Sequence, residues 1–513
     1  MDDDRATTLR AEALAAQGQG RFEAAIAGFR HAVEAAPRQT EGYVALADCL
    51  LVARRPEVAL QVCDVGLREA GASAPLLCAR ARILQSLSRV AAAAVAFREA
   101  LSLDSGSADA RFGLALQAVE AGNWDEAVSL SAPLIARPNV DPPTQWLAAR
   151  IALARGELEA ARAHAGTALA SGSLAPDQLA ETALLLGEAL DGLGRPAEAF
   201  AAFVRGKSAL RAFYAERASA AEPETARFER LSRWFAAADP APWRTAPPSR
   251  QAGKVRGHAF LVGFPRSGTT LLEQALAGHP GVVALEEAPT LAEACDAFLA
   301  DAAGLQRLER LSAFEAEHWR AVYWRTVRAH GASPEGRVFL DKAPAGTLYL
   351  PLIAKLFPDA KVLFALRDPR DVVLSCFRSS FQMNALTYAF TDLGEAARCY
   401  GACMSMADVY RRVLPLRLRE VRYERLVDDL AAELAAITAF LGLDAEAGMA
   451  DVAATAQRRI VRTPSAPQVR AGLNRKGLGR WRAYAAELAP VQSILAPWVE
   501  RFGYEPEPGG ASG

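Results

Sequence analysis

The chain has 513 residues, more than one ordinary hydrophobic core accommodates, so we expect two or three domains. Hydrophobic residues make up 51% and charged residues 23% of the chain, a balance typical of folded proteins and not of disordered ones. The formal net charge of −1 excludes a global field that would draw the protein onto nucleic acid or an anionic membrane, so any anion site must be local.

The N-terminal residues MDDDRATTLR are acidic and polar, whereas a secretory signal begins with basic residues and continues with an apolar run. No stretch approaches the roughly 20 apolar residues that a membrane helix requires. The seven cysteines are scattered and lack the CxxC pairs of zinc sites. We therefore expect a cytoplasmic protein with reduced, mostly buried thiols, without a metal, a membrane or a nucleic acid as partner.

The first half of the chain repeats with a period of 34 residues. Alanine recurs at this spacing, and a second, mostly small residue follows seven positions later; the alanines are Ala25, Ala59, Ala93, Ala127 and Ala161. A sixth unit, with Ala199, Phe203 and Gly206, follows after a slip of four residues. Small residues at two turns of paired antiparallel helices let the backbones approach closely. A generic alanine-rich bundle would not hold one register through five units, so we prefer a repeat array.

Period and pattern resemble the tetratricopeptide (TPR) repeat, which implies an all-α solenoid over residues 6–235. Stacked repeats present a concave groove, so this half is expected to bind a protein or peptide, either a partner or the acceptor of a reaction. A dimerisation surface, which would make a homodimer, and a scaffold for the second half are the alternatives. The Pro- and Ala-rich run at 238–254 predicts a linker over 236–256.

Short apolar strands alternate with helices over 257–508, which predicts an α/β domain with a central parallel sheet. The strand HAFLVGF (258–264) runs into the turn PRSGTT (265–270) and then a helix. Backbone N–H groups of such a turn, together with the helix N-terminus, form a phosphate cradle. Gly263 and Gly268 have the GxxxxG spacing of a P-loop, but Thr269 stands where a nucleotidase carries lysine, which argues against a P-loop kinase.

Two further basic elements follow. In KVLFALRDPRDVVLSCF (361–377) a buried-type strand ends at Arg367, and Ser375 lies eight residues on in a helix, so both can grip one phosphate. A solvated charge cluster is the alternative for RDPRD. The second element contains RKGLGRW (475–481), within a stretch from 452 to 486 that has eight Arg or Lys and no Asp or Glu. A nucleic-acid patch fits it poorly, because the stretch is short and lacks interleaved aromatic residues.

Together these elements resemble the donor motifs of sulfotransferases, nearest to the tyrosylprotein sulfotransferase branch and to bacterial TPR-linked sulfotransferases, over residues 257–505. The resemblance implies a P-loop-like sulfotransferase domain that uses 3′-phosphoadenylyl sulfate (PAPS) as cosubstrate. Tyr423 sits where the family often places a tyrosine near the adenosine, although a core tyrosine is an equally simple interpretation. The implied donor-binding residues are Arg266, Ser267, Gly268, Thr269, Thr270, Arg367, Ser375, Tyr423, Arg475, Lys476 and Gly477.

The resemblance also implies a catalytic set of Glu287, Lys342 and Arg266. Glu287 matches the base of the tyrosylprotein branch, with Glu286 as the neighbouring alternative and a helix-start carboxylate as the plain one. Lys342 follows another strand, in FLDKAPAG (339–346), and would stabilise charge on the leaving phosphate. The acceptor would be a hydroxyl of a peptide or protein tyrosine or of a carbohydrate. A non-catalytic TPR adaptor with an inactive transferase domain is the remaining alternative.

Overall fold

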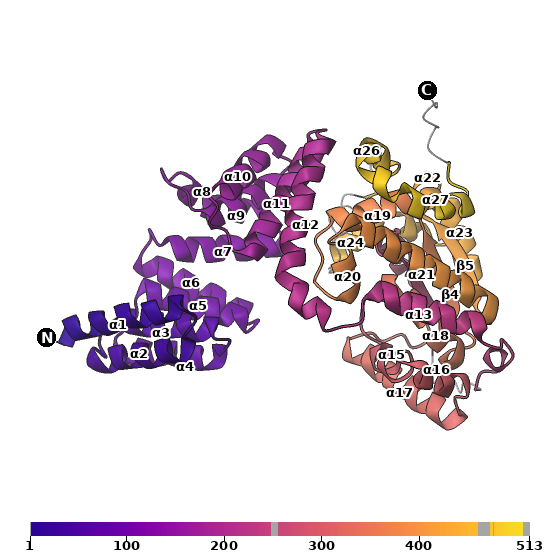
Figure 1. The fold of residues 1–513 in the computed structure, drawn as a ribbon, viewed down its shortest axis with the longest axis horizontal. Helices are drawn as coiled ribbons and strands as arrows, with labels where there is room; N and C mark the ends of the chain where they lie inside the picture. The colour runs from indigo at the N-terminus through magenta and orange to yellow at the C-terminus, as the bar shows by residue number, and fades with distance from the viewer. Residues whose placement is uncertain (1, 248–254, 460–471, 474, 476, 506–513) are drawn as a thin grey trace. The chain divides into compact units, whose positions relative to one another are not determined.

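A computed structural model describes residues 2–247, 255–459, 472–473, 475 and 477–505 (Figure 1). The chain divides into two compact units, Met1–Gly194 and Arg195–Gly513. Among the described residues, no helix combines the length and the apolar character that crossing a membrane requires. All seven cysteines are buried free thiols, as the sequence predicts.

The first unit consists of helices joined by short turns, and each consecutive pair packs together (Figure 1). The first helices of the pairs are α1 (Asp2–Gly18), α3 (Thr40–Val52), α5 (Ala74–Ser86), α7 (Ala108–Ala121) and α9 (Pro142–Ala154). The second helices are α2 (Phe22–Ala35), α4 (Pro56–Glu69), α6 (Val90–Leu103), α8 (Trp124–Ile135) and α10 (Leu158–Ala170). The last helix of the unit, α11 (Pro176–Gly192), packs on α10 and α9. This arrangement is the TPR-type array that the period of 34 predicts.

The repeat register has a direct steric basis. Every alanine of the 34-residue series is the fourth residue of a second helix, and all five are buried. Close approach is visible at Gly113, where an added Cβ would lie 2.2 Å from Cζ of Phe97. At Gly66 an added Cβ would lie 2.8 Å from the ring of Tyr43. The small residues are therefore required for the helix contacts that the sequence analysis inferred.

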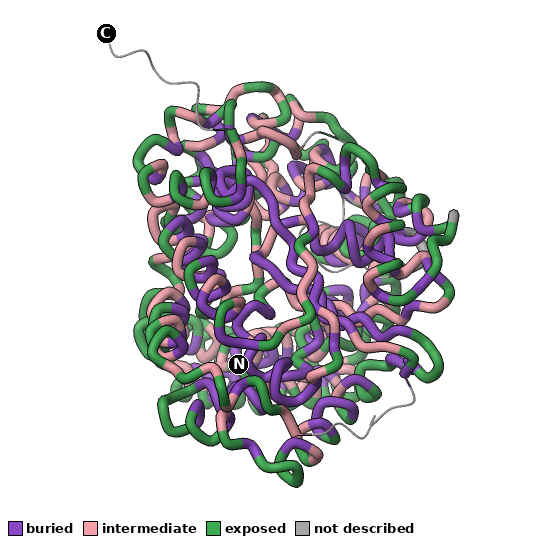
Figure 2. Tube along the Cα trace, turned by 90° about the vertical axis from the view of Figure 1, so that its right-hand side faces the viewer, coloured by how far each residue is buried: buried purple, intermediate pink, exposed green. Residues whose placement is uncertain are grey.

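The second unit contains a five-stranded parallel sheet in the order β2-β3-β1-β4-β5. Its strands are β1 (Gly257–Gly263), β2 (Val282–Glu286), β3 (Val338–Lys342), β4 (Lys361–Leu366) and β5 (Arg417–Arg422). Buried stretches of chain run through the interior of this unit (Figure 2). The three inner strands β1, β3 and β4 are buried along most of their length, as expected for a parallel sheet covered on both faces.

Side chains of β1 alternate between two hydrophobic cores. Phe260 and Val262 belong to the larger core, and Ala259 and Leu261 belong to the smaller one. Helices of the larger core are α13 (Glu224–Ala237), α15 (Ala292–Phe298), α16 (Ala302–Glu309), α17 (Ala313–Ala329), α18 (Leu350–Leu356), α19 (Pro369–Arg378), α20 (Ala385–Ala389), α21 (Leu393–Val413), α26 (Ala485–Leu488) and α27 (Gln492–Arg501). Those of the smaller core are α14 (Thr269–Ala277), α22 (Tyr423–Asp428), α23 (Leu430–Leu441) and α24 (Val452–Arg458).

Two helices that precede the sheet, α12 (Pro196–Ser219) and α13, belong to the second unit. The sequence analysis placed them in the repeat domain that ends near residue 235. On α12, the buried Lys207 donates from Nζ to the carbonyl of Ser379 at 2.6 Å, directly after α19. On α13, Phe235 packs its ring against Trp243 and Tyr410, at centroid distances of 4.8 and 4.9 Å. The α/β unit therefore begins well before its first strand.

Candidate functional site

The predicted site residues follow the carboxyl ends of the strands. β1 ends at Gly263, β2 at Glu286, β3 at Lys342 and β4 at Leu366. Because the strands are parallel, these ends lie at one edge of the sheet, where ligands bind in open α/β folds. The structure thus brings the turn after β1, the glutamate pair, Lys342 and the RDPRD segment to the same edge.

The turn after β1 leads directly into α14, which begins at Thr269. Gly268 precedes the helix in the left-handed conformation, with φ of 93°. An added Cβ there would lie 2.5 Å from Cδ2 of Tyr423, so glycine is required by both backbone and space. Ser267, Thr269 and Thr270 are buried around this helix N-terminus. The first N–H groups of an α-helix have no partner inside the helix, so this end can bind an anion.

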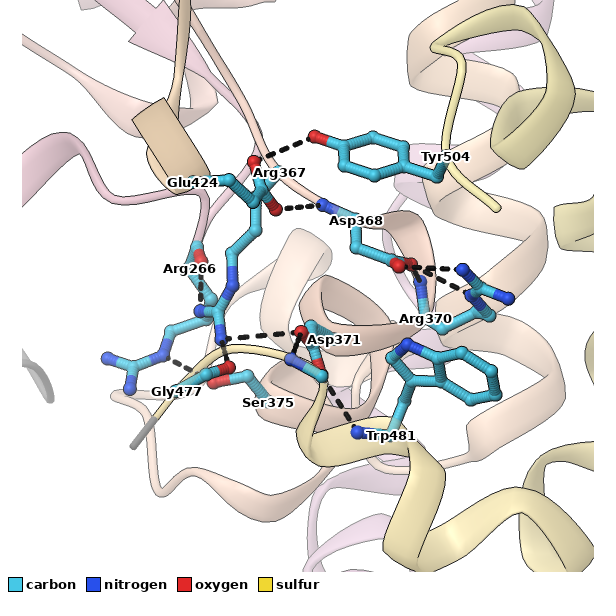
Figure 3. Close-up of polar contacts among 11 residues, drawn as sticks. Arg266, Arg367, Asp368, Arg370, Asp371, Ser375, Glu424, Gly477, Trp481 and Tyr504 are labelled. Atoms are coloured by element: carbon cyan, nitrogen blue, oxygen red, sulfur yellow. Dashed lines mark hydrogen bonds and ion pairs between the residues drawn. The ribbon is translucent and has the colours of Figure 1, made fainter. Parts of the chain in front are cut away.

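Arg266 and Ser375 are in contact across the site. Nε of Arg266 donates to Oγ of Ser375, on α19, at 2.9 Å (Figure 3). Burial lowers the pKa of Arg266 to about 10, which leaves the guanidinium charged at neutral pH. One side chain predicted for the 5′ end of the donor and one predicted for its 3′ end therefore share a hydrogen bond.

Arg367 lies beside this pair, and its guanidinium contacts two backbone carbonyls (Figure 3). Nη1 donates to the carbonyl of Arg266 at 3.1 Å, and Nη2 donates to the carbonyl of Gly477. The guanidinium also stacks 4.6 Å from the ring of Tyr423. Its buried Nε has no hydrogen-bond partner among the described residues. A buried cationic donor without an acceptor fits a phosphate group, which would supply one.

The rest of the RDPRD segment is buried, which excludes the solvated charge cluster considered above. Arg370 pairs with Asp368 through contacts of 2.7 and 2.9 Å and stacks 3.7 Å from the ring of Trp481. Asp371 accepts from the backbone N–H groups of Gly479 and Trp481, each at 2.8 Å (Figure 3). Asp371 therefore fixes the turn at 477–481 to α19.

The basic segment near the C-terminus reaches the site through Gly477. Its backbone carbonyl accepts from Arg367. Arg475 is 72% exposed at its side chain and pairs with Asp428 at 2.8 Å. Lys476 lies outside the described residues, as does the whole segment from 460 to 471.

Lys342 forms the second half of the site, together with the glutamate pair. Its Nζ lies 2.7 Å from Oε1 of Glu287 and 3.2 Å from Oε1 of Glu286. The Lys342 side chain is fully buried, whereas the side chains of Glu286 and Glu287 are 14% and 44% exposed. The backbone N–H of Glu287 also donates to the carbonyl of Lys342 at 2.8 Å, so both chain segments are held together.

Sequence reasoning missed two charged residues of this cluster. Glu273 on α14 is fully buried, and its Oε2 lies 3.9 Å from Nζ of Lys342. Nη1 of Arg459 lies 2.8 Å from Oε1 of Glu273, and Nη2 donates to the carbonyl of Ala284 at 3.0 Å. A glutamate among the apolar residues of a buried helix (LLEQALAG) was the one signal that could have identified Glu273.

Backbone strain marks two of the predicted catalytic residues. Arg266 and Glu287 have positive φ angles of 71° and 49°. Only two other non-glycine residues in the described chain share this property, Arg54 and Ser88, and both lie in turns between repeat helices. Left-handed backbone at a non-glycine residue costs of order 1–3 kcal/mol and gathers at functional sites.

Within the described residues, no group of three or more His, Cys, Asp or Glu side chains could hold a metal ion. His279 lies just beyond the C-terminal end of α14. Its Nδ1 accepts from the N–H of Gly281 at 2.8 Å, and its Nε2 lies 3.0 Å from the carbonyl of Asp444. The polar chemistry of this sheet edge is therefore that of arginine, lysine, glutamate and hydroxyl side chains.

Comparison with known proteins agrees with this geometry. Residues 259–447 match the model of the sulfotransferase family. An uncharacterized protein of Aquifex aeolicus is 28% identical over 272 residues, which are 47% of this chain and 33% of that protein. The nodulation protein NoeE of Sinorhizobium fredii is 28% identical, over 38% of this chain and 52% of its own length. The chain thus spans about a third of the length of the first relative and about half of the length of the second.

Protein-tyrosine sulfotransferase 2 of Gallus gallus is 26% identical, over 48% of this chain and 69% of its own length. The sulfotransferase domain of a Synechococcus olefin synthase covers 51% of this chain and all of its own, with 24% identity and a TM-score of 0.31. The pilus biogenesis factor PilW covers 40% of this chain and 92% of its own, with 18% identity and a TM-score of 0.34. The chain therefore consists of a helical repeat array followed by an α/β unit with a parallel sheet, and residues 259–447 of that unit match the sulfotransferase family model.

Proposed function

We propose that the second unit transfers a sulfuryl group from PAPS to a hydroxyl acceptor. The observation that carries the proposal is the buried Arg367, whose Nε lacks an acceptor among the described residues while Arg266, Ser375 and Tyr423 surround it. A donor with a 3′-phosphate would supply that acceptor. The alternative is a kinase, whose donor ATP has no 3′-phosphate to fill this position.

The donor would be held from two sides. The N-terminus of α14, with Ser267, Thr269 and Thr270, would bind the 5′-phosphosulfate, because its N–H groups and helix dipole favour an anion. Arg367 and Ser375 would bind the 3′-phosphate. Tyr423 packs against Gly268 and Arg367 and so would lie between these two anion sites, at the place of the nucleoside.

Glu287 would act as the base. Its carboxylate is the most exposed of those around Lys342, so an acceptor hydroxyl can reach it. As Glu287 takes the proton of that hydroxyl, the acceptor oxygen bonds to sulfur, and the bond between sulfur and the bridging oxygen of the donor breaks. Lys342 would donate a hydrogen bond to the bridging oxygen, which keeps the electron pair and leaves with the 5′-phosphate. Arg266 would stabilise the charge on the sulfuryl oxygens.

The acceptor is proposed to be a peptide or protein tyrosine or a carbohydrate hydroxyl. One of the relatives named above carries the name of a protein-tyrosine sulfotransferase, which supports an acceptor of this class. The repeat array would present the acceptor or bind another protein, as stacked helical repeats commonly do. A chain that binds PAPS without turnover would instead be an adaptor.

The function can be tested by ligand-dependent thermal unfolding. The by-product 3′-phosphoadenosine 5′-phosphate should raise the melting temperature of the full chain more than ATP does at equal concentration. Arg367→Ala should abolish this preference, whereas Arg398→Ala, which removes a half-exposed arginine paired with Glu395, should keep it. Equal or larger stabilisation by ATP would contradict the sulfotransferase assignment and favour a kinase.

A further inference from the structure

The carboxylates around Lys342 differ in exposure, and the fully buried one has no role in the reaction described above. Glu287 is 44% exposed at its side chain and Glu286 14%, whereas Glu273 has no exposed side-chain surface. Glu273 therefore cannot meet an acceptor. Its contacts must explain why a carboxylate is kept inside the smaller hydrophobic core.

A buried carboxylate is unfavourable unless charged or hydrogen-bonding partners surround it. Glu273 has three such partners from three parts of the chain. Arg459 lies at 2.8 Å, the amide Nε2 of Gln274 donates to it at 3.2 Å, and Lys342 lies at 3.9 Å. Burial raises the pKa of Glu273, whereas Lys342 and Arg459 lower it. Glu273 thus contacts two cations: Arg459, which is anchored to the carbonyl of Ala284, and the proposed catalytic Lys342.

The charges of the cluster can be counted from these contacts. The carboxylates of Glu273, Glu286 and Glu287 carry −3, and Lys342 and Arg459 carry +2, so the ionised cluster has a net charge of −1. When Glu287 takes a proton, the net charge becomes zero. Lys342 then still has two carboxylate partners, and Arg459 still neutralises part of Glu273.

We propose that Glu273 is a positioning residue, whose carboxylate, anchored by Arg459, holds the Lys342 ammonium in place while Glu287 changes its charge. Without it, the protonated Glu287 would leave Glu286 as the one remaining carboxylate partner of Lys342 in this cluster. Glu273 also ties Lys342 to α14, the helix that begins at the phosphate-binding turn. The ammonium and the anion site are thereby fixed to the same rigid element.

The inference rests on the proposed function for the protonation of Glu287, but the position of Lys342 can be measured without turnover. The chain has only six lysines, at 207, 254, 342, 355, 361 and 476, so ¹⁵N-lysine labelling gives a simple spectrum. A lysine ammonium held inside the protein by carboxylates exchanges its protons slowly with water and shows an Nζ cross-peak. The Lys342 peak would be assigned with Lys342→Arg.

Glu273→Gln removes the charge and keeps the shape, and its amide oxygen can still accept from Arg459. We expect the Lys342 cross-peak to be lost and kcat to fall by about 10-fold to 100-fold, since small misplacements of catalytic groups have effects of this size. Affinity for 3′-phosphoadenosine 5′-phosphate should stay within about twofold, because the variant leaves Arg367 and Ser375 unchanged. Glu273→Asp should restore part of the cross-peak and of kcat.

Gln274→Leu is the matched control, because it removes the neighbouring amide without changing the charge of the cluster; it should keep the Lys342 peak. An unchanged peak in Glu273→Gln would overturn the inference, whatever the stability of the variant. Should that variant fail to fold, Glu286→Gln combined with Glu287→Gln gives a second test. Glu273 then remains, so the peak should persist, and its loss would overturn the inference.

The two proposals fail in different ways. If wild-type protein transfers no sulfuryl group while the Lys342 peak depends on Glu273, the proposed function is wrong and the positioning role stands. If the wild type is active and kcat and the peak are both insensitive to Glu273→Gln, the positioning role is wrong and the function stands.

Discussion

Removing the repeat array should have opposite effects depending on where the chain is cut. Deletion of residues 1–194 removes one compact unit and leaves the other intact. Deletion of residues 1–235 also removes α12 and most of α13 from the second unit. We expect the shorter deletion to give a folded protein that binds 3′-phosphoadenosine 5′-phosphate and the longer one to give a protein that aggregates.

The magnitude follows from the side chains that the longer deletion removes. Phe228, Leu231 and Phe235 of α13 are at most 1% exposed and belong to the larger core. Burying each such side chain stabilises the fold by about 1.5–3 kcal/mol, so the three together contribute about 5–9 kcal/mol. A domain is typically stable by only about 5–15 kcal/mol in total. Loss of Lys207 would in addition remove its hydrogen bond to Ser379, at the end of the helix that carries Ser375.

Three measurements on each truncated chain decide the matter: the soluble fraction on expression, the melting temperature, and the by-product affinity by calorimetry. Phe235→Ala in the full chain is a milder test, expected to cost about 3–5 kcal/mol through the cavity left beside Trp243 and Tyr410. A soluble 236–513 chain with the same melting temperature and affinity as 195–513 would refute the reasoning.

Three further predictions concern single side chains. Glu287→Gln should lower turnover by roughly 10² or more with little change in by-product affinity, and Glu286→Gln should lower it less; the reverse order in a turnover assay would identify Glu286 as the base. Burial raises the pKa of Asp371 to about 6, so calorimetry should show by-product affinity falling as the pH drops through about 6, because the protonated carboxyl no longer accepts both backbone N–H groups. In Asp371→Asn the by-product affinity should be lower and should not fall further as the pH drops through about 6. If the variant shows a fall of the same size, the titrating group belongs to the ligand and the prediction for Asp371 is wrong. Gly268→Ala should abolish by-product binding, since the new Cβ meets Tyr423, and an unchanged affinity would contradict the close packing.

Much of this fold could be predicted from short stretches of sequence, because the contacts that these stretches specify lie within one helix pair or one turn. The 34-residue series of alanines fixes which face of each second helix packs, so the register can be read without tertiary information. The strand, turn and helix around Gly268 are likewise encoded within fourteen residues (257–270), since positive φ and close packing both require that glycine. The pairing of Arg367 with Ser375 at one phosphate stays a prediction; it depends on the eight residues between the end of β4 and the Ser375 position on α19.

Contacts between residues far apart in the chain could not be predicted from the sequence. Glu273 and Arg459 are 186 residues apart, and nothing in either local pattern indicates the other. Helix α12 carries the repeat signature at Ala199 and Phe203, yet its Lys207 contacts the chain after α19, so its assignment depends on a contact 172 residues away. The direction of the Gly477 contact was also undetermined, because a backbone position offers both a donor and an acceptor.

The boundary at Gly194 and Arg195 coincides with the point where the repeat period slips by four residues, from Ala161 to Ala199. Repeat arrays gain and lose whole units by duplication and deletion, because each unit contacts mainly its neighbours. Such changes upstream of this junction would alter the length of the array while α12 stays with the second unit. The slip therefore marks the natural place to exchange arrays between proteins: a chimera joined before α12 keeps the whole second unit, whereas one joined at the Pro-rich run after α13 does not.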